Sequence, residues 1–288
     1  MKDETSLDEI KAMKRARAEE RKELEALRLT VERLSAQRHY VINDAGTTNT
    51  IRFALIGDRH IGSVYERSDA VERFYDLLKR EKITTVLDAG DVLDGAGIYK
   101  GQEYEQYAIG LDRQFSALAE HAPTIPGITT HFIIGNHDYS FYKAIGADPG
   151  PRIAEITGWK YAGRDQAWIE LRNAAGKAVS VMLLHPDGGT AYALSYRPQK
   201  LVEALPGGKK PDILGIGHYH KAEWIPEYRN VSVFQTGTFQ SQTPYMARKG
   251  SPAHVGGWIV EVTPGRENLT CRVRAEFVAF YEPEERVK

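Results

Sequence analysis

Five groups of polar side chains occur along the chain, each directly after an apolar segment. They are Asp58 and His60 in DRH, Asp91 in GD, Asn136, His137 and Asp138 in GNHD, His185 at the end of VSVMLLH, and His218 and His220 in GHYH. Carboxylate, imidazole and carboxamide groups without thiolates suit Mn, Fe or Zn in a hydrolytic site. Two such ions about 3.5–4 Å apart stabilise both the attacking and the leaving oxygen of a phosphoryl transfer. The pattern therefore indicates a dinuclear metal centre that hydrolyses phosphoesters.

Each motif also has a purely structural interpretation. An Asp-x-His pair is common by chance, Asn-His-Asp can form a turn with side-chain hydrogen bonds, and GHYH can be two exposed loop histidines. All five motifs in this order, each at the end of an apolar strand, favour the metal centre. Asp91 is the expected bridging ligand because it follows the middle strand.

The apolar segments that precede these motifs have the length and composition of buried strands. They are IRFALIG (51–57), ITTVLD (83–88), THFIIG (130–135), VSVMLLH (179–185) and DILGIG (212–217). Helices are predicted from a cap at Ser68 to about residue 79 and over about 103–120, and the tail from Val231 favours antiparallel strands. This alternation predicts an α/β fold, in which ligands gather at the carboxyl ends of the strands.

Three parts are expected along the chain: a helix over 1–38, a linker over 39–50 that includes the turn-rich NDAGTTNT, and a catalytic domain over 51–288. Leu24, Leu27, Val31 and Leu34 form a short heptad stripe in the helix. This stripe is compatible with packing on the same domain or with self-association into a homo-oligomer. Nucleic-acid binding through the helix is not favoured, because its basic and acidic residues nearly balance.

Composition excludes several classes of protein. The 288 residues are 42% hydrophobic and 27% charged, as expected for a soluble globular protein and not for a disordered chain. A single cysteine, Cys271, excludes an internal disulfide and fits a reducing, cytoplasmic location. No apolar run is long enough to span a membrane, so no membrane partner is expected. The formal net charge of −1 excludes no phosphate substrate, since two bound cations would make the site positive.

The five motifs together resemble the signature of the calcineurin-like metallophosphoesterases, over about residues 51–263. The resemblance implies a two-sheet αββα sandwich, here with an N-terminal helical extension, and two divalent ions, Mn foremost, with Fe, Zn or Ni as alternatives. It implies that Asp58, His60, Asp91 and His220 hold one ion and that Asp91, Asn136, His185 and His218 hold the other. It further implies a metal-bridging hydroxide nucleophile, His137 as general acid, and Asp138 as the group that orients the His137 ring. One departure is Pro-Asp-Gly-Gly after His185, where a His-Gly type turn is expected.

Two longer segments resemble the small subunit of the archaeal family D DNA polymerase, whose phosphoesterase domain is a 3′→5′ exonuclease. They are DAGDVLDGAGIYKGQEYEQY (88–107) and QTGTFQSQTPYMARKG (235–250). The resemblance implies DNA as the substrate. Tyr99, Tyr104 and Tyr139 are candidates to stack a terminal nucleotide, and Arg248 is a candidate to contact a backbone phosphate. The 50 residues before the first strand are too few for that subunit's oligonucleotide-binding barrel, so a stand-alone relative is expected.

Two other functions are compatible with the sequence. A phosphatase or phosphodiesterase acting on a small nucleotide or a phosphoprotein would use the same ligands, and a non-catalytic scaffold would use the same fold. An exonuclease predicts an open groove beside the metals, lined by 99–107 and 239–249. A small-molecule enzyme predicts a closed pocket there, and a scaffold predicts a blocked centre. The complete ligand set argues against the scaffold.

Overall fold

The computed structural model describes residues 39–281, except 44, 48, 190, 192, 207–209 and 266–271. The helix expected over 1–38, its expected self-association, and Cys271 lie outside the described residues. Within the described residues, no helix is long and apolar enough to cross a membrane.

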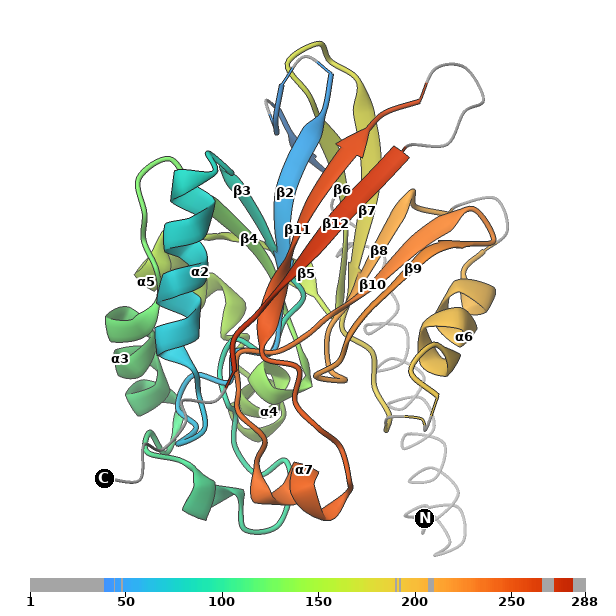
Figure 1. The fold of residues 1–288 in the computed structure, drawn as a ribbon. Coiled ribbons are helices and arrows are strands. Elements are labelled where there is room, and N and C mark those ends of the chain that lie inside the picture. The colour runs from blue at the N-terminus through green and yellow to red at the C-terminus, as the bar shows by residue number, and fades with distance from the viewer. Residues whose placement is uncertain are drawn as a thin grey trace, which may run out of the picture. The chain divides into compact units, whose positions relative to one another are not determined.

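Two six-stranded sheets form the centre of the domain (Figure 1). One contains, in spatial order, β1 (His39–Ile42), β6 (Gln166–Arg172), β7 (Ala178–Leu184), β8 (Ile213–Ile216), β10 (Val231–Thr236) and β9 (Ala222–Tyr228). The other contains β12 (Arg272–Ala279), β11 (Gly256–Thr263), β2 (Ile51–Ile56), β3 (Thr85–Asp88), β4 (Thr129–Ile134) and β5 (Lys160–Arg164). Strands β2 to β5 run parallel, whereas β11 and β12 pair antiparallel, as expected for the tail.

Helices cover the outer faces of the sheets. The helical elements of the described residues are α2 (Ser68–Arg80), η1 (Gln102–Glu105), α3 (Leu111–His121), α4 (Asn136–Ile145), α5 (Gly150–Thr157), α6 (Tyr196–Ala204) and α7 (Pro244–Arg248), of which α4 and α7 lie beyond one end of the sheets. Figure 1 shows α2, α3 and α5 on the side of β2 to β5, and α6 on the side of β8 to β10. The layers run helix, sheet, sheet, helix, which confirms the predicted αββα sandwich.

Apolar clusters hold these layers together. The cluster between the sheets includes Leu55 and Ile133 from one sheet and Val181 and Phe234 from the other, all buried. A second cluster packs α2 on the outer face of its sheet, with Phe74 fully buried. Each fully buried side chain of this size contributes about 1.5–3 kcal/mol. Strands β2, β3 and β4 are buried along nearly their whole length because layers cover both of their faces.

The strand arrangement brings the polar motifs to one end of the sandwich. Parallel strands β2, β3 and β4 end at the same edge, and the loops after them carry Asp58, Asp91 and Asn136. Parallel strands β7 and β8 of the other sheet lead into His185 and His218. The two sheets therefore contribute ligands to one site between their carboxyl ends.

The prediction of a linker over 39–50 is wrong for its first four residues. Residues 39–42 form β1, which pairs in parallel with β6, from His39 opposite Trp168 to Ile42 opposite Leu171. The Tyr40 hydroxyl also donates a hydrogen bond to the carbonyl oxygen of Tyr161 (2.7 Å). This strand depends on a partner more than 120 residues later in the chain, so local sequence patterns could not reveal it.

The two predicted helices also begin differently. The segment expected as a helix over 103–120 contains the short η1 turn and then α3, which starts only at Leu111. Gly110 interrupts a continuous helix over this segment, because its φ of 88° is positive whereas helical residues have negative φ. Ser68 is the first residue of α2 and not its cap, since Arg67 occupies the cap position and no side chain caps this helix.

Stability is expected to fall between pH 6.5 and pH 4 because of His131 in β4. This side chain is 9% exposed, its Nδ1 has no hydrogen-bond partner among the described residues, and burial lowers its pKa from 6.5 to about 4. Since the unfolded chain takes up a proton first on acidification, the folded state loses about 2 kcal/mol at pH 5 relative to neutral pH. Urea unfolding at pH 5 and at neutral pH gives the free energy of unfolding of the wild-type protein and of His131→Leu. Acidification should lower this free energy by about 2 kcal/mol less in the variant than in the wild-type protein. An equal loss in both proteins would contradict the prediction.

Candidate metal centre

The first group of donor atoms comes from the loops after β2 and β8. The Nε2 atoms of His60 and His220 face each other at 2.9 Å, and Asp58 Oδ1 lies 3.6 Å from His220 Nε2. Asp58 and His60 are at most 1% exposed. Three donor atoms from distant parts of the chain thus converge on one point.

The second group lies beside the first and is joined to it by Asp91. Asp91 Oδ2 lies 3.1 Å from His185 Nε2 and 4.0 Å from His60 Nε2, which belongs to the first group. Asn136 Oδ1 lies 3.1 Å from His185 Nε2 and 2.8 Å from His218 Nδ1. The structure therefore brings the side chains of all seven expected metal ligands close together, and their spacing is compatible with the two sets that the resemblance implies.

These donor sets fit divalent cations. Nitrogen and oxygen atoms bound to one ion at about 2.0–2.2 Å lie roughly 3 Å apart. The distances given above run from 2.8 to 4.0 Å, so small movements of the side chains would allow them to bind an ion. His185 Nδ1 donates to the carbonyl oxygen of Ala89 (2.7 Å) and His218 Nε2 to that of Gly188 (2.6 Å). Because a carbonyl only accepts, the neutral form of each ring carries its proton on this nitrogen, and the other nitrogen is the one that can bind an ion. The Pro-Asp-Gly-Gly turn after His185 thus provides the group that orients His218.

The pKa shifts of the buried ligands also indicate that the site suits cations. Burial disfavours the protonated form of His185, yet the neighbouring Asp91 and Asp58 carboxylates raise the pKa of this side chain to about 10. Burial raises the pKa of Asp58 to about 7. A buried cluster of carboxylates that perturbs its neighbours in this way is balanced by cations in a functional metal site.

The backbone is strained at the ligands. Nine non-glycine residues in the described part of the chain have positive φ, and five of these are expected metal ligands. The five are Asp58 (φ 55°), His60 (φ 51°), Asp91 (φ 53°), His218 (φ 79°) and His220 (φ 54°). Such conformations cost about 1–3 kcal/mol each and persist where the surrounding structure enforces them, commonly at functional sites. Their concentration here indicates that ligand placement takes precedence over local backbone preference.

Gly135 leaves room for the second group of donors. A Cβ atom at this position would overlap Asp91 Oδ1 and would lie 2.6 Å from Cε1 of His185. No residue with a side chain fits between β4 and the ligands without moving them. The glycine of GNHD is therefore required by close packing.

His137 lies beside the donor atoms but belongs to neither of the two donor sets. Its backbone N–H donates to Asp91 Oδ1 (2.8 Å), and its ring Nδ1 donates to the carbonyl oxygen of Asp94 (2.6 Å). The ring lines the cavity above the metal centre, so Nε2 is the nitrogen left for a substrate. Burial lowers the pKa of this imidazole.

The expectation that Asp138 orients the His137 ring is wrong. The Asp138 carboxylate accepts hydrogen bonds from the backbone N–H groups of Gly135 (2.9 Å), Val92 (3.1 Å) and Leu93 (2.8 Å). Burial, with the nearby charge of Asp91, raises the pKa of Asp138 to about 7. Asp138 therefore links the GD loop to the start of α4, and none of the hydrogen bonds described for its carboxylate goes to the His137 ring.

Asp94 takes the orienting role, and the sequence analysis missed it. Its carbonyl oxygen holds His137, and its Oδ1 lies 3.4 Å from Nδ1 of His60. Gln102 Nε2 donates to the Asp94 carbonyl oxygen (2.8 Å), and Gln106 Nε2 donates to Asp94 Oδ2 (2.6 Å). The available signal was the second aspartate in GDVLD, three residues after Asp91. The Gln-rich segment after it thus positions two histidines of the site through one aspartate.

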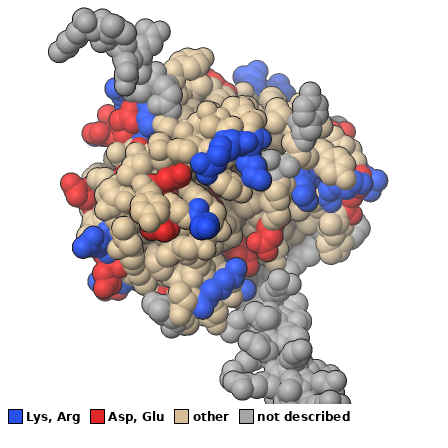
Figure 2. All heavy atoms as spheres, turned by 90° about the horizontal axis from the view of Figure 1, so that it is seen from below, with Lys and Arg blue, Asp and Glu red and all other residues tan. Residues whose placement is uncertain are grey.

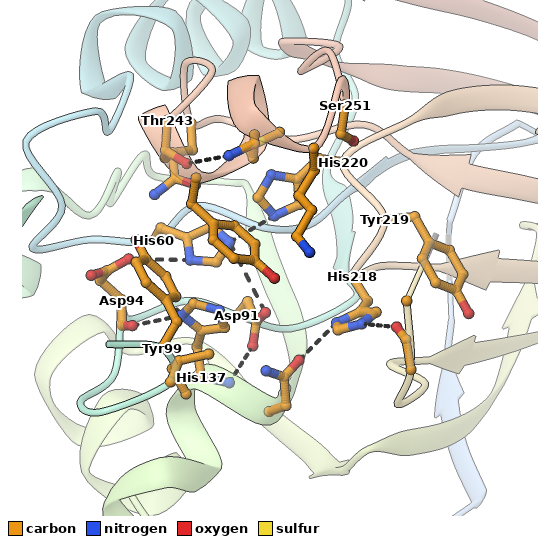
Figure 3. A pocket seen from close by; sticks show the side chains of 18 of the residues that line it. His60, Asp91, Asp94, Tyr99, His137, His218, Tyr219, His220, Thr243 and Ser251 are labelled. Carbon is orange, nitrogen blue, oxygen red and sulfur yellow. Dashed lines mark hydrogen bonds and ion pairs between the residues drawn. The ribbon is translucent and has the colours of Figure 1, made fainter. Parts of the chain in front are cut away.

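A cavity of about 660 Å³ lies over the donor atoms. Figure 3 shows Tyr99, Asp94 and His137 on one side of it and His218 and Tyr219 on the other. The residues lining it also include Thr243, Tyr245, Lys249 and Ser251 from the segment after β10. The centre is accessible from this cavity and is not blocked.

The expected substrate contacts are only partly placed at this cavity. Tyr99 lines it, and Arg248 lines a neighbouring cavity. Tyr104 is 85% exposed, and Tyr139 stacks on another tyrosine of α4 with ring centroids 5.0 Å apart; neither lines either cavity. The sequence analysis missed Tyr245, although it lies within the quoted segment QTPYMARKG.

Similar proteins were found among curated sequences. The chain is 27% identical over 233 residues to the DNA polymerase II small subunit of Halobacterium salinarum and 28% identical over 246 residues to that of Methanocaldococcus jannaschii. These alignments cover 68% and 69% of this chain and 45% and 40% of the relatives. The chain therefore spans less than half the length of these two proteins.

Solved structures and a family model also match. GAP50 of Plasmodium aligns with a TM-score of 0.49 and 12% identity, covering 80% of this chain and 85% of that one. Vps29 from Cryptosporidium parvum aligns with a TM-score of 0.40 and 18% identity, covering 81% and 100%. Residues 51–222 match the model of the calcineurin-like phosphoesterases. Because this match makes up more than half of the chain and includes every expected metal ligand, the protein belongs to the calcineurin-like phosphoesterase family.

Proposed function

We propose that the protein is a divalent-metal-dependent nuclease that removes nucleotides from the 3′ end of DNA, with Mn²⁺ as the preferred ion. The observation that carries this proposal is the pair of donor sets sharing Asp91, accessible from a cavity that His137 lines. Similarity to DNA polymerase II small subunits supports DNA as the substrate class. The aromatic and basic residues beside the cavity are compatible with that substrate.

Asp58, His60, Asp91 and His220 would hold one ion, and Asp91, Asn136, His185 and His218 the other. When bound, the two ions would supply positive charge to the phosphoryl group and make water a stronger nucleophile. His137 binds Asp94 through Nδ1, so Nε2 is placed to hold a proton for the leaving oxygen. Asp94 limits rotation of the ring and thereby keeps Nε2 directed into the cavity.

The test compares two substrates in the presence of Mn²⁺. Single-stranded DNA labelled at its 5′ end should give a ladder of products that shorten from the 3′ end. Bis(p-nitrophenyl) phosphate, which contains one phosphodiester and no nucleotide, reports the basic hydrolytic activity. EDTA should abolish both reactions.

Each result identifies one function. Hydrolysis of the dye substrate with intact DNA would overturn the nuclease and favour a phosphodiesterase for small molecules. Shortening from the 5′ end would overturn the proposed polarity. A protein that contains both ions and hydrolyses neither substrate would favour a scaffold.

A further inference from the structure

A second cavity, of about 450 Å³, lies next to the metal cavity. It is lined by Tyr99, Lys100, Tyr245, Arg248 and Lys249. Tyr99, Tyr245 and Lys249 line both cavities, so the two are contiguous. Three of the five lining residues are cationic and none is acidic, and these three form no ion pair with any described residue.

The positive charge of this cavity is local. Figure 2 shows the end of the domain where α7 lies, with Lys and Arg side chains in separate groups and Asp and Glu between them. The sequence as a whole carries a formal net charge of −1. A cavity lined only by cations and tyrosines therefore differs from its surroundings and is suited to an anion.

Two aromatic rings form the wall between the cavities. Tyr99 and Tyr245 stack with ring centroids 4.7 Å apart and an interplanar angle of 15°. The Tyr99 hydroxyl donates to Glu105 Oε2 (2.7 Å), which fixes its ring, whereas Tyr245 is 40% exposed. The wall thus offers a held aromatic pair whose outer member is accessible to solvent.

The segment that carries Arg248 and Lys249 is linked to the metal centre by hydrogen bonds. The Thr238 hydroxyl donates to the carbonyl oxygen of Asp58 (2.7 Å), and Gln240 Nε2 donates to Oγ of Ser63 (3.0 Å). At the start of α7, Thr243 Oγ1 accepts a hydrogen bond from the backbone N–H of Met246 (3.2 Å). These hydrogen bonds fix the distance between the second cavity and the ligands, as a strand bridging the two sites requires.

We propose that this second cavity binds the phosphodiester next to the scissile one on a single-stranded nucleic acid. Lys100, Arg248 and Lys249 would contact its phosphate, and the Tyr99–Tyr245 pair would support the intervening sugar and base. This inference rests on the proposed nuclease function and defines its substrate as a strand with at least two phosphates. A substrate with one phosphate occupies the metal centre alone and gains nothing from the second cavity.

Binding of fluorescein-labelled single-stranded oligonucleotides tests the inference. The Mn²⁺-loaded His137→Asn protein, in which hydrolysis is slowed, is titrated with a dinucleotide and an octanucleotide, and fluorescence anisotropy gives both Kd values. The preference for the octanucleotide is the Kd of the dinucleotide divided by the Kd of the octanucleotide. Adding Arg248→Ala and Lys249→Ala should reduce this ratio about tenfold. It should also make octanucleotide binding less dependent on salt, with a log–log slope that falls by about 0.7 for each phosphate that the variant no longer neutralises.

Two control variants test whether the effect is specific to the position and charge of Arg248 and Lys249. Lys79→Ala with Arg80→Ala removes two exposed cations from the far end of α2 and should preserve the preference. Arg248→Lys with Lys249→Arg keeps the charge and should restore most of it, which excludes misfolding of α7 as the cause.

The outcomes separate this inference from the proposed function. If the wild-type protein shortens DNA but the double alanine variant keeps its octanucleotide preference, the second cavity is not a phosphate site and the nuclease stands. If the preference falls but the wild-type protein leaves DNA intact, the nuclease fails and the second site stands. If the protein neither binds nor cleaves the octanucleotide, both are overturned.

Discussion

Replacing His137 with alanine is expected to lower kcat for phosphodiester hydrolysis by about 10²- to 10⁴-fold, the usual contribution of a general acid. The protein should still contain both ions, because the His137 ring lies outside the two donor sets that share Asp91. Its Nδ1 is engaged by the Asp94 carbonyl oxygen, and only Nε2 is left to protonate a leaving oxygen. A large loss of rate at full metal content is the combination that identifies the acid.

Cleavage of single-stranded DNA labelled at its 5′ end and metal analysis of the same samples measure both quantities, because the alkoxide that leaves from DNA must be protonated. His121→Ala is the matched control, since this histidine lies at the end of α3, binds Glu66 and does not line the cavity. It should keep the wild-type rate. Full activity in His137→Ala would remove this residue as the acid, and loss of the ions would make it a structural support of the centre.

The contact between Asp94 and His137 could not be predicted from the sequence. The resemblance to the metallophosphoesterases implied that Asp138, the carboxylate next to His137 in GNHD, orients the histidine. In the structure, adjacent residues at the start of α4 point in different directions, and Asp138 turns back to three backbone N–H groups. The partner of His137 comes from a loop 43 residues earlier, a proximity that only the parallel pairing of β3 and β4 creates.

That the expected ligands lie at one edge of the sheets, by contrast, was predictable from the residues. Ligands that follow buried parallel strands must meet at one edge of the sheet, whatever the lengths of the connections between them. That rule needs only the strands, and the apolar segments before Asp58, Asp91, Asn136, His185 and His218 are unmistakable. Side chains whose direction depends on tertiary contacts were harder to predict. Tyr139 of α4 stacks on a second tyrosine of the same helix, whereas Tyr245, on the five-residue α7, lines the cavity.

Strands at the sheet edges and helix boundaries were harder for a related reason. β1 is held by β6, and neither strand has a ligand motif or a strong local signal. The start of α3 depends on the positive φ of Gly110, and glycine also tolerates ordinary helical angles. In both places the decisive interaction is with the rest of the fold.

Replacing Asp91 with asparagine is expected to remove both ions, whereas Asp58→Asn should remove only one. Asp91 Oδ2 is the atom that faces ligands of both sets, at 3.1 Å from His185 Nε2 and 4.0 Å from His60 Nε2. Asparagine keeps the volume of the side chain and can still accept the hydrogen bond from the backbone N–H of His137 through Oδ1. It replaces the shared anionic oxygen with an NH₂ group, which repels cations on both sides.

Loss of a supporting group near a metal already weakens binding about 10- to 100-fold, so loss of a shared ligand should exceed the upper value. Calorimetric titration of the metal-free proteins with Mn²⁺ gives the number of sites and their affinities. Asp187→Asn is the control, because this exposed carboxylate lines the cavity but belongs to neither donor set, and two sites should remain. If Asp91→Asn instead lost a single site, as Asp58→Asn is expected to do, Asp91 would serve one ion only and the two sets would bind independently.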